Sequence, residues 1–367
     1  MKHEIFIDGR PLFHTVFYSF GTILRNVIPL MAEEYKIVLL SDIIDDSEEN
    51  RDVLNKVSDV INLGSRISGI EGTLAKYFTW EHQIVETYGP DFFWEIGSYL
   101  IDSFHKTISV VTLHDLFPLY DGSRKNFIRR IGFKFFVKRT IRNADAIVTP
   151  SKFTADELIR NIGIPKKYLI IPNGIPAPIE LVNKPNVILP KEYTLYIGRL
   201  GFVKGTDILL DVYDRYSPQY KLVLSGKCVD NEIQQKLEAL HQQGKVLYLG
   251  FTKDDEKEFL IRNAKYMIYP SRYDGFGIPP LEAAIRKVGV IMSNIPVLIE
   301  TTQKRGVYFD ISKGSDALWN VMQLVEGNTD AFNISDMYEI ASGYSWEDYY
   351  LKMNELLMNL LEERQEG

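Results

Sequence analysis

The stretch from Ile268 to Ala284, IYPSRYDGFGIPPLEAA, decides the fold of the chain. It begins inside an apolar run from Tyr266 to Tyr269, which predicts a buried β-strand. Gly275 and Gly277 then predict a glycine-rich loop, and Pro279 is typical of the first turn of a helix. A strand, a glycine turn and a helix in this order predict one repeat of a parallel α/β sheet.

The same alternation recurs along the whole chain. Short apolar runs rich in β-branched residues alternate with segments of helical period, such as residues 73 to 87, and this pattern favours an α/β fold with parallel sheets. The predicted strands are Glu4 to Asp8, Lys36 to Ser41, Asp91 to Glu95, Ile108 to Leu113, Ala146 to Thr149, Thr194 to Ile197, Lys221 to Ser225, Val246 to Leu249, Tyr266 to Tyr269 and Gly289 to Met292.

The length of 367 residues suits two domains better than one core. A proline-rich stretch, residues 171 to 190, holds five of the 16 prolines and favours an irregular crossover between them. If two doubly wound units face each other, ligands bind in the cleft at the carboxyl ends of the strands. We predict a Rossmann-like domain over 1–172, a linker over 173–190, a second Rossmann-like domain over 191–344, and a C-terminal helix over 345–367 that packs back toward the first domain.

Composition narrows the class of protein. Hydrophobic residues make up 45% and charged residues 25%, as in soluble globular proteins. The uncharged stretch from Pro11 to Leu24 is shorter than the roughly 20 residues of a spanning helix, so we expect no transmembrane segment. The N-terminus lacks the apolar core of a secretory signal, and the single cysteine, Cys228, favours a reducing cytoplasm. The net charge of -7 argues against a globally basic nucleic-acid binder.

A second chemical motif is LYIGRLGFVKGTDILL, residues 195 to 210. Its predicted strand ends at Ile197, and a helix is expected to begin near Gly205. Free amides at glycine turns and helix N-termini bind anions, and Arg199 and Lys204 can neutralise a diphosphate there. By itself, the motif is better explained by an ordinary strand-to-helix turn that carries two solvated cations.

Two acids lie eight residues apart around the glycine loop, Asp274 before it and Glu282 after it. Both can face a ligand held at that loop. Alternatively, Asp274 caps a turn and Glu282 complements the helix dipole. The joint occurrence of this motif with the cationic one favours a ligand site.

Together these motifs resemble glycosyltransferase family 4, the retaining, sugar-nucleotide-dependent enzymes of the GT-B fold. The resemblance covers nearly the whole chain, and several motifs in the right order are far more specific than any one of them. The matching strings are TLHDLFPL from Thr112, ADAIVTPSKFTADEL from Ala144, IIPNGI from Ile170, IGRL with the following KG, GFGIPPLEAA, and SWEDYYLKM near the end.

The resemblance implies roles for individual residues. Arg199 and Lys204 would hold the donor diphosphate, and Glu282 would bind the nucleotide ribose. Asp274 would meet the donor sugar, although the family usually has glutamate at that position. His114, at the end of a predicted strand, would lie beside the transferred sugar. The other donor-binding residues that we predict are Gly198, Lys227, Gly275, Phe276, Gly277 and Ile278.

The first domain departs from the family pattern after its first strand. A glycine-rich loop is usual there, but this chain has RPLFHTVFYSFGTILRN with only Gly21 inside it. Phe17 and Tyr18 in this segment are either core residues or aromatic walls of an acceptor site. We also place Asp115 on the acceptor side, next to His114.

A basic segment from Arg124 to Arg142 holds eight cations, four phenylalanines and no acid. It is either an amphipathic face that meets an anionic membrane, or a helix with core phenylalanines and solvated cations. An RNA-binding role has less support, because no nucleic-acid motif accompanies the segment. The residues proposed for membrane contact are Arg124, Lys125, Arg129, Arg130, Lys134 and Lys138.

The sequence therefore predicts a retaining hexosyltransferase that uses a nucleotide-diphosphate sugar, with GDP-mannose as first choice from the TLHDL string. The acceptor is a saccharide or lipid-linked saccharide of surface polysaccharide or glycolipid synthesis. We expect no metal or other cofactor, and a cytoplasmic location that includes the inner face of the membrane. The alternatives are a sugar-nucleotide-binding pseudoenzyme that regulates an active transferase and, with less support, a sugar-nucleotide epimerase.

Overall fold

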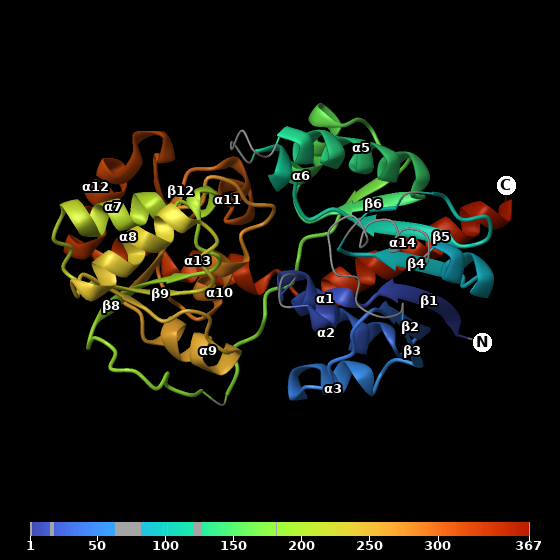
Figure 1. Cartoon of the computed structure of the whole chain (residues 1–367), viewed down its shortest axis with the longest axis horizontal. Coiled ribbons are helices and arrows are strands. Elements are labelled where there is room, and N and C mark those ends of the chain that lie inside the picture. The colour runs from blue at the N-terminus through green and yellow to red at the C-terminus, as the bar shows by residue number, and fades with distance from the viewer. Residues whose placement is uncertain are drawn as a thin grey trace. The chain divides into compact units, whose positions relative to one another are not determined.

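The computed structural model describes residues 2–14, 18–62, 82–97, 99–100, 102–120, 127–180 and 182–366. It divides the chain into two compact units, one of residues 1–174 with 345–367 and one of residues 175–344. Each unit contains one parallel sheet with helices packed on it (Figure 1). The predicted α/β fold with two Rossmann-like units is confirmed.

The first sheet has the strand order β3-β2-β1-β4-β5-β6-β7, with all neighbours parallel. The chain order reverses between β1 and β4, and such a switch point is where doubly wound sheets bind ligands. The strands are β1 (His3–Asp8), β2 (Tyr35–Ser41), β3 (Asp59–Asn62), β4 (Phe92–Glu95), β5 (Ile108–Thr112), β6 (Ala146–Thr149) and β7 (Tyr168–Ile170).

The second sheet has the order β10-β9-β8-β11-β12-β13, again parallel throughout. Its switch point lies between β8 and β11. The strands are β8 (Tyr193–Ile197), β9 (Lys221–Ser225), β10 (Val246–Tyr248), β11 (Tyr266–Tyr269), β12 (Val290–Ser293) and β13 (Val307–Phe309).

The helices lie between the strands, as the alternating pattern predicts. The predicted helix over 73–87 is described only from residue 82, and residues 82 to 88 are helical. The first unit contains α1 (Arg10–Phe13), α2 (Tyr18–Met31), α3 (Glu48–Leu54), α5 (Phe127–Asn143), α6 (Lys152–Asn161) and α14 (Trp346–Glu366). The second contains α7 (Thr206–Arg215), α8 (Asn231–Gln242), α9 (Asp254–Arg262), α10 (Ile278–Ile285), α11 (Pro296–Thr301), α12 (Gly314–Gly327) and α13 (Ile334–Ser342).

The ten strands predicted from sequence are all present, each to within one residue at either end. Their apolar runs are continuous because a parallel sheet is covered on both faces, and β5, β6 and β8 are buried along their whole length. Three strands were missed, β3, β7 and β13, and all three lie at sheet edges. A strand at a sheet edge is less buried than a central strand and therefore needs fewer apolar residues. Strands β3 and β7 are largely exposed.

The proline-rich stretch from 171 to 190 contains neither helix nor strand among its described residues. Two arginines of the second unit hold its backbone. Arg262 Nη2 donates to the Ile179 carbonyl at 2.6 Å, and Arg286 Nη2 donates to the Ala177 carbonyl at 3.3 Å. These bonds satisfy carbonyl groups that have no ladder or helix partner.

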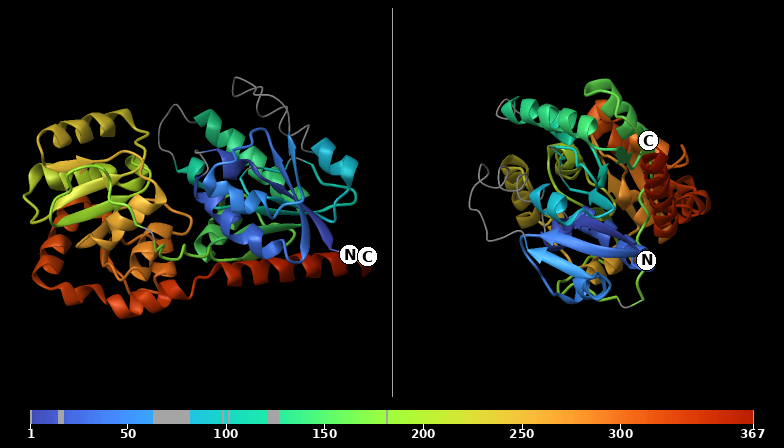
Figure 2. Two further views of the ribbon diagram at one scale, coloured as in Figure 1. Left: turned by 90° about the horizontal axis from the view of Figure 1, so that it is seen from below. Right: turned by 90° about the vertical axis from the view of Figure 1, so that its right-hand side faces the viewer.

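The C-terminal helix α14 returns to the first unit and lies along it (Figure 2). Ser345 caps its N-terminus, because its hydroxyl oxygen accepts the Asp348 amide at 3.0 Å. The buried side chains of α14 join the hydrophobic core of the first sheet, with Met353 and Leu357 fully buried. Helix α14 is therefore part of the core of a domain that lies more than 170 residues away in sequence.

We expect Leu357→Ala to destabilise the protein by about 2 to 5 kcal/mol, because it leaves a cavity in that core. Leu351→Ala is the matched control on the same helix, since Leu351 is 61% exposed and its loss costs less than about 0.5 kcal/mol. Denaturant unfolding of both variants checks this. Equal midpoints for the two would contradict the packing of α14 described above.

Candidate active site

The turn after β8 depends on one glycine. Gly205 precedes α7 with a φ of 68°, in the left-handed region that favours glycine. A Cβ atom there would lie 1.8 Å from the carbonyl oxygen of Pro270, which follows β11. Only glycine therefore allows the short helix Phe202–Lys204 and the start of α7 to approach the loop after β11 this closely.

This close approach brings Lys204 and Asp274 together. Lys204 Nζ donates to Asp274 Oδ2 at 2.6 Å and to the Tyr273 carbonyl at 3.3 Å. The Tyr269 hydroxyl also donates to Asp274 Oδ2, and the Gly275 amide donates to Oδ1 at 3.0 Å. The Lys204 and Asp274 side chains are 26% and 16% exposed, so their ion pair is partly shielded from water.

The surroundings of Asp274 control its charge. Burial alone would raise its pKa, but the charge of Lys204 and the hydrogen bonds to the carboxylate outweigh burial and lower the pKa. Burial and the adjacent Asp274 carboxylate hold the pKa of Tyr269 well above its usual value. Asp274 is therefore ionised at neutral pH, and Tyr269 keeps its proton and donates it in a hydrogen bond.

The other predicted cations lie in the connections that leave the same edge of the second sheet, where its strands end. Gly198 follows β8 and its amide donates to the Ser225 carbonyl at 3.0 Å, while the Lys227 carbonyl accepts the Leu200 amide at 2.9 Å. The Arg199 and Lys227 side chains are exposed. Three predicted donor-binding cations, Arg199, Lys204 and Lys227, thus follow the neighbouring strands β8 and β9.

The glycine loop after β11 begins helix α10. Gly277 adopts a φ of 86° and precedes the helix, whose first residue Ile278 is half-buried. Phe276 is only 4% exposed, and its ring packs edge to face on the ring of Tyr344, with the ring centroids 5.2 Å apart. The Phe276 ring thus packs inside the second unit, and of this residue the backbone is the part left for a ligand.

Glu282 on α10 is 4% exposed and forms an ion pair with Lys257 of α9, Nζ to Oε1 at 2.8 Å. Burial by itself would lower the pKa of Lys257, but the charges of Glu282 and Asp254 outweigh burial, and the net effect raises the pKa. The lysine therefore stays charged. Sequence analysis missed Lys257, because no motif marks it and only folding brings α9 to α10.

Arg272 is a further residue that the motifs did not reveal. Its guanidinium forms a bidentate ion pair with Asp207 of α7, at 2.5 and 2.7 Å, and lies 4.0 Å from the centre of the Phe202 ring. It thereby ties the loop after β11 to the turn after β8. Its position inside the string SRYDGFG is the one sequence signal that could have indicated it.

In the first unit, His114 and Asp115 follow β5. His114 Nε2 donates to the Ile96 carbonyl at 3.0 Å, and its ring stacks on Phe20 with centroids 4.0 Å apart. Burial lowers the pKa of His114 to about 4, so the imidazole is neutral at pH 7. Asp115 Oδ1 accepts the Phe117 amide at 2.8 Å.

The remaining acceptor-side predictions are Phe17 and Tyr18. Phe17 is outside the described residues, and Tyr18 is the first residue of α2. Sequence analysis also missed a buried ionic cluster in the first unit. Arg10 Nε lies 2.6 Å from Asp8 Oδ1, and Arg10 Nη2 lies 3.7 Å from Glu95 Oε1, where β1 and β4 end at the switch point.

The basic segment is only partly described, because Arg124 and Lys125 lie outside the described residues and Arg129 is described only as part of α5. On one side of α5, Phe133 and Val137 are buried in the core. The opposite stripe is exposed and combines cations with apolar side chains. It consists of Arg130, Ile131, Lys134, Phe135 and Lys138, and is called the α5 stripe below.

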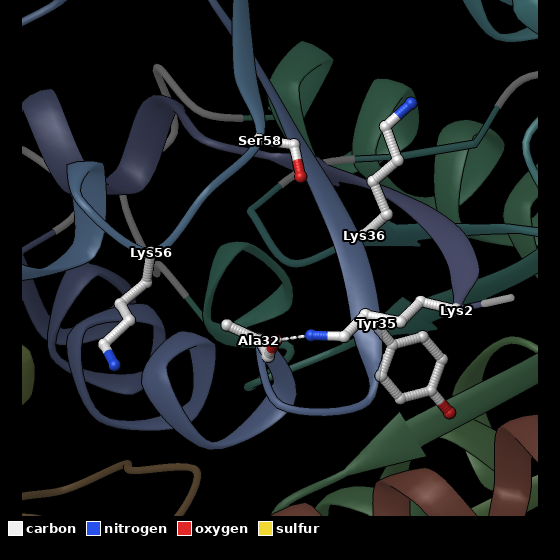
Figure 3. Close-up of a pocket in the computed structure, with 6 residues that line it drawn as sticks. All are labelled: Lys2, Ala32, Tyr35, Lys36, Lys56 and Ser58. Atoms are coloured by element: carbon white, nitrogen blue, oxygen red, sulfur yellow. Dashed lines mark hydrogen bonds between the residues drawn. The ribbon is translucent and has the colours of Figure 1, made fainter.

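A pocket also occurs in the first unit at the amino-terminal ends of the strands, around the starts of β1 and β2 (Figure 3). Lys2 Nζ donates there to the Ala32 carbonyl at 2.7 Å, while Lys36 and Lys56 point away from one another. The lysines do not converge on a common point, so the pocket does not resemble an anion site.

Two further findings concern partners of the chain. Within the described residues, no group of three or more His, Cys, Asp or Glu side chains is arranged to hold a metal ion. Among the helices in the described part of the chain, none is long and apolar enough to cross a membrane.

Solved structures similar to this chain define the class of fold. Sucrose-phosphate synthase from Thermosynechococcus elongatus has a TM-score of 0.76 at 18% identity, over 98% of this chain and 99% of that one. HepE from Anabaena, in complex with UDP-glucose, has a TM-score of 0.69 at 16% identity, over 97% and 99%. The chain has the GT-B fold of two Rossmann-like domains.

Family models identify the group within that fold. The model for glycosyltransferase family 4 matches residues 47–177, and the model for glycosyl transferases group 1 matches residues 179–331. Both models describe glycosyltransferases and together they match most of the chain, which is thus similar to the family 4 glycosyltransferases, as its motifs predicted.

Three of the curated relatives illustrate the similarity. The O-antigen chain mannosyltransferase RfbU of Salmonella typhimurium is 29% identical over 61% of this chain and 65% of its own length. The O-antigen chain mannosyltransferase B of Escherichia coli is 28% identical over 55% and 57%. The GDP-mannose:cellobiosyl-diphosphopolyprenol alpha-mannosyltransferase of Xanthomonas oryzae is 23% identical over 61% and 59%. The matched region thus spans less than two thirds of each relative.

The ion pair between Lys204 and Asp274 predicts a pH-dependent stability. A lowered folded-state pKa stabilises the fold fully above the unfolded value of about 3.8, and this contribution is lost as pH falls through the folded-state pKa. We expect Lys204→Met to destabilise the protein by about 1 to 3 kcal/mol at pH 7, and by progressively less toward pH 3. Denaturant unfolding at several pH values measures the gap, and a gap independent of pH would contradict the ion pair.

Proposed function

We propose that the chain is a retaining hexosyltransferase that moves a hexose from a nucleotide-diphosphate sugar to a hydroxyl group of an acceptor. The observation that carries the proposal is the meeting of Lys204 and Asp274 at the switch point of the second sheet, with Arg199 in the same turn. A cation for a diphosphate and a carboxylate for sugar hydroxyls are what such a donor requires at one place.

In the proposed mechanism, the bond between the sugar and the diphosphate breaks through an oxocarbenium-like transition state. Negative charge then develops on the leaving phosphate, where Arg199 and Lys204 stabilise it. The acceptor oxygen attacks on the face that the diphosphate leaves, and a phosphate oxygen of the donor takes its proton. The sugar therefore keeps its anomeric configuration without a protein side chain as general base.

The other donor residues follow from the same arrangement. Glu282 is proposed to accept hydrogen bonds from the ribose hydroxyls, and Lys257 holds its carboxylate in place. Gly198, Gly275, Gly277 and Ile278 are proposed to bind the donor through backbone amides around the two turns.

We propose GDP-mannose as the donor. The support is that three relatives are named mannosyltransferases, and one of these names includes GDP-mannose. The proposed acceptor is a saccharide or lipid-linked saccharide of surface polysaccharide or glycolipid assembly, since two of the names refer to the O-antigen chain. No metal is included in the mechanism.

The first unit is proposed to bind the acceptor. In this proposal His114 contacts the transferred sugar. Its Nε2–H donates to the Ile96 carbonyl, so Nδ1 of the neutral ring is left to accept a hydrogen bond from a sugar hydroxyl. Phe17 and Tyr18 are proposed as aromatic walls for the acceptor, and Asp115 as a polar contact.

A sugar-nucleotide-binding pseudoenzyme is the second candidate. The observation in its favour is that Lys204 and Asp274 neutralise each other, and that Asp274 replaces the usual glutamate. The two candidates differ in turnover, because a pseudoenzyme binds the sugar nucleotide without consuming it.

We further propose that the α5 stripe docks on an anionic lipid surface, at the inner face of the cell membrane. Ile131 and Phe135 are 55% and 59% exposed, and three cations flank them. Apolar side chains that enter the headgroup region beside Lys and Arg are typical of interfacial helices. This position would bring a cytoplasmic enzyme to a lipid-linked acceptor.

We expect Arg199→Ala and Lys204→Ala each to lower the rate of sugar transfer at least about a hundredfold, because each removes a group that stabilises the leaving diphosphate. Lys245→Ala is the control, since this exposed lysine pairs with Asp214 outside the site. Release of the nucleoside diphosphate measures transfer, and circular dichroism checks folding. Near-normal turnover in both site variants would remove the diphosphate assignment.

We expect Lys134→Glu/Lys138→Glu to abolish sedimentation with vesicles that contain phosphatidylglycerol. High salt should have the same effect, because screening shortens the Debye length to about 3 Å at 1 M. The matched control Lys184→Glu/Lys191→Glu changes the net charge equally at two exposed lysines, one in the linker and one directly after it. Binding that is equal on neutral vesicles, or equally weakened in the control, would refute docking by the α5 stripe.

A further inference from the structure

We infer that Tyr269 is a positioning residue for the Asp274 carboxylate, which it holds by Oδ2 so that Oδ1 faces the donor sugar. This inference rests on the proposed function and adds a residue that the motifs do not assign. Tyr269 lies in β11, and its place in an apolar run predicts only an ordinary core residue.

The Tyr269 ring is held rigidly. It is the last residue of β11, which is hydrogen-bonded between β8 and β12, and its side chain is 3% exposed. Its ring is nearly parallel to that of Tyr196 on β8, with an interplanar angle of 15° and centroids 6.4 Å apart. The hydroxyl at the end of this ring therefore donates to Asp274 from a fixed place.

A count of acceptor sites separates the two oxygens of Asp274. Each carboxylate oxygen can accept about two hydrogen bonds. Oδ2 already accepts two, from Tyr269 and Lys204. Among the described residues, Oδ1 accepts only the amide of the adjacent Gly275. Oδ1 is therefore the oxygen with capacity left for a sugar hydroxyl.

The two donors to Oδ2 respond differently to a donor substrate. A diphosphate attracts the ammonium group of Lys204, which sits on a flexible side chain and can turn toward the new anion. The Tyr269 hydroxyl is neutral and cannot follow. When Lys204 turns to the diphosphate, Tyr269 remains to keep the carboxylate from rotating.

The charged and titratable groups around Asp274 come from four elements. They are Lys204 from the turn after β8, Tyr196 from β8, Tyr269 from β11, and Glu282 from α10. Burial raises the pKa of Asp274, while Lys204 and then the Tyr269 hydrogen bond lower it. Removing the Tyr269 hydroxyl alone should therefore raise the pKa of Asp274 and leave the other three groups unchanged.

The test is Tyr269→Phe, with Tyr193→Phe as matched control. Tyr193 is also buried, in β8, but its hydroxyl donates to the Leu260 carbonyl at 2.9 Å, outside the site. Consumption of GDP-mannose, UDP-glucose and dTDP-rhamnose is measured first, and kcat and KM then follow for the sugar nucleotide that the unaltered chain consumes fastest. Calorimetry with the matching nucleoside diphosphate reports on nucleotide binding separately.

For Tyr269→Phe we expect kcat to fall about tenfold, the equivalent of one lost hydrogen bond, and the affinity for the nucleoside diphosphate to change less than about twofold. The acid limb of its kcat profile should move to higher pH. Tyr193→Phe should change neither quantity. A structural defect alone would not move the pH profile.

The double variant Tyr269→Phe/Asp274→Asn tests whether Tyr269 acts through Asp274. If it does, Tyr269→Phe has little further effect once the carboxylate is gone. An equal loss of kcat in the Asp274→Asn background, or a kcat and pH profile like those of Tyr193→Phe, would overturn the inference. If the unaltered chain binds nucleoside diphosphates but consumes no sugar nucleotide, the proposed function fails instead, and the inference fails with it.

Discussion

The ion pair between Lys204 and Asp274 joins the connections that follow two adjacent strands, β8 and β11, at the point where the strand order of the sheet reverses. Both residues follow a strand end, and parallel strands end at one edge, so the fold itself delivers them there. The approach also needs the absence of a side chain at Gly205, and the clamp of Arg272 on Asp207. The geometry of the site follows from these contacts.

This pair balances the charge of Lys204. A cation shielded from water is costly without a partner, and here the carboxylate of Asp274 compensates it. The same arrangement recurs at Glu282, which Lys257 compensates. Behind it, Glu258 pairs with both Arg262 and Arg286, so Asp274, Glu282 and Glu258 each have a cationic partner. In the proposed function, a diphosphate takes the place of Asp274 as the partner of Lys204.

Much of the fold could be predicted from the sequence. Ten of the strands are continuous apolar runs, because both faces of each parallel sheet are covered by helices. Sequence analysis missed β3, β7 and β13, which are short edge strands of three or four residues with partial exposure. The site divides in the same way. Four of the site residues could be predicted because they lie in motifs whose glycines indicate a turn; these are Arg199, Lys204, Asp274 and Glu282.

Partners that only the fold supplies could not be predicted. Lys204 and Asp274 are 70 residues apart, and Lys257 reaches Glu282 from a different helix. Nothing in the sequence distinguishes Tyr269 from the apolar residues of its strand. The sequence of α5 did not show which of its phenylalanines face the core. The structure separates buried Phe133 from exposed Phe135.

The central claim is that the second unit binds a nucleoside diphosphate between the two turns, with Glu282 on its ribose. Isothermal titration calorimetry with GDP, UDP and dTDP, on the unaltered chain and on Glu282→Gln, tests it most directly. The account predicts that GDP binds in preference to the other two, and that Glu282→Gln weakens its affinity at least about tenfold, the loss of a charged hydrogen bond. If none of the three nucleotides binds, or if Glu282→Gln binds as tightly as the unaltered chain, the account is wrong.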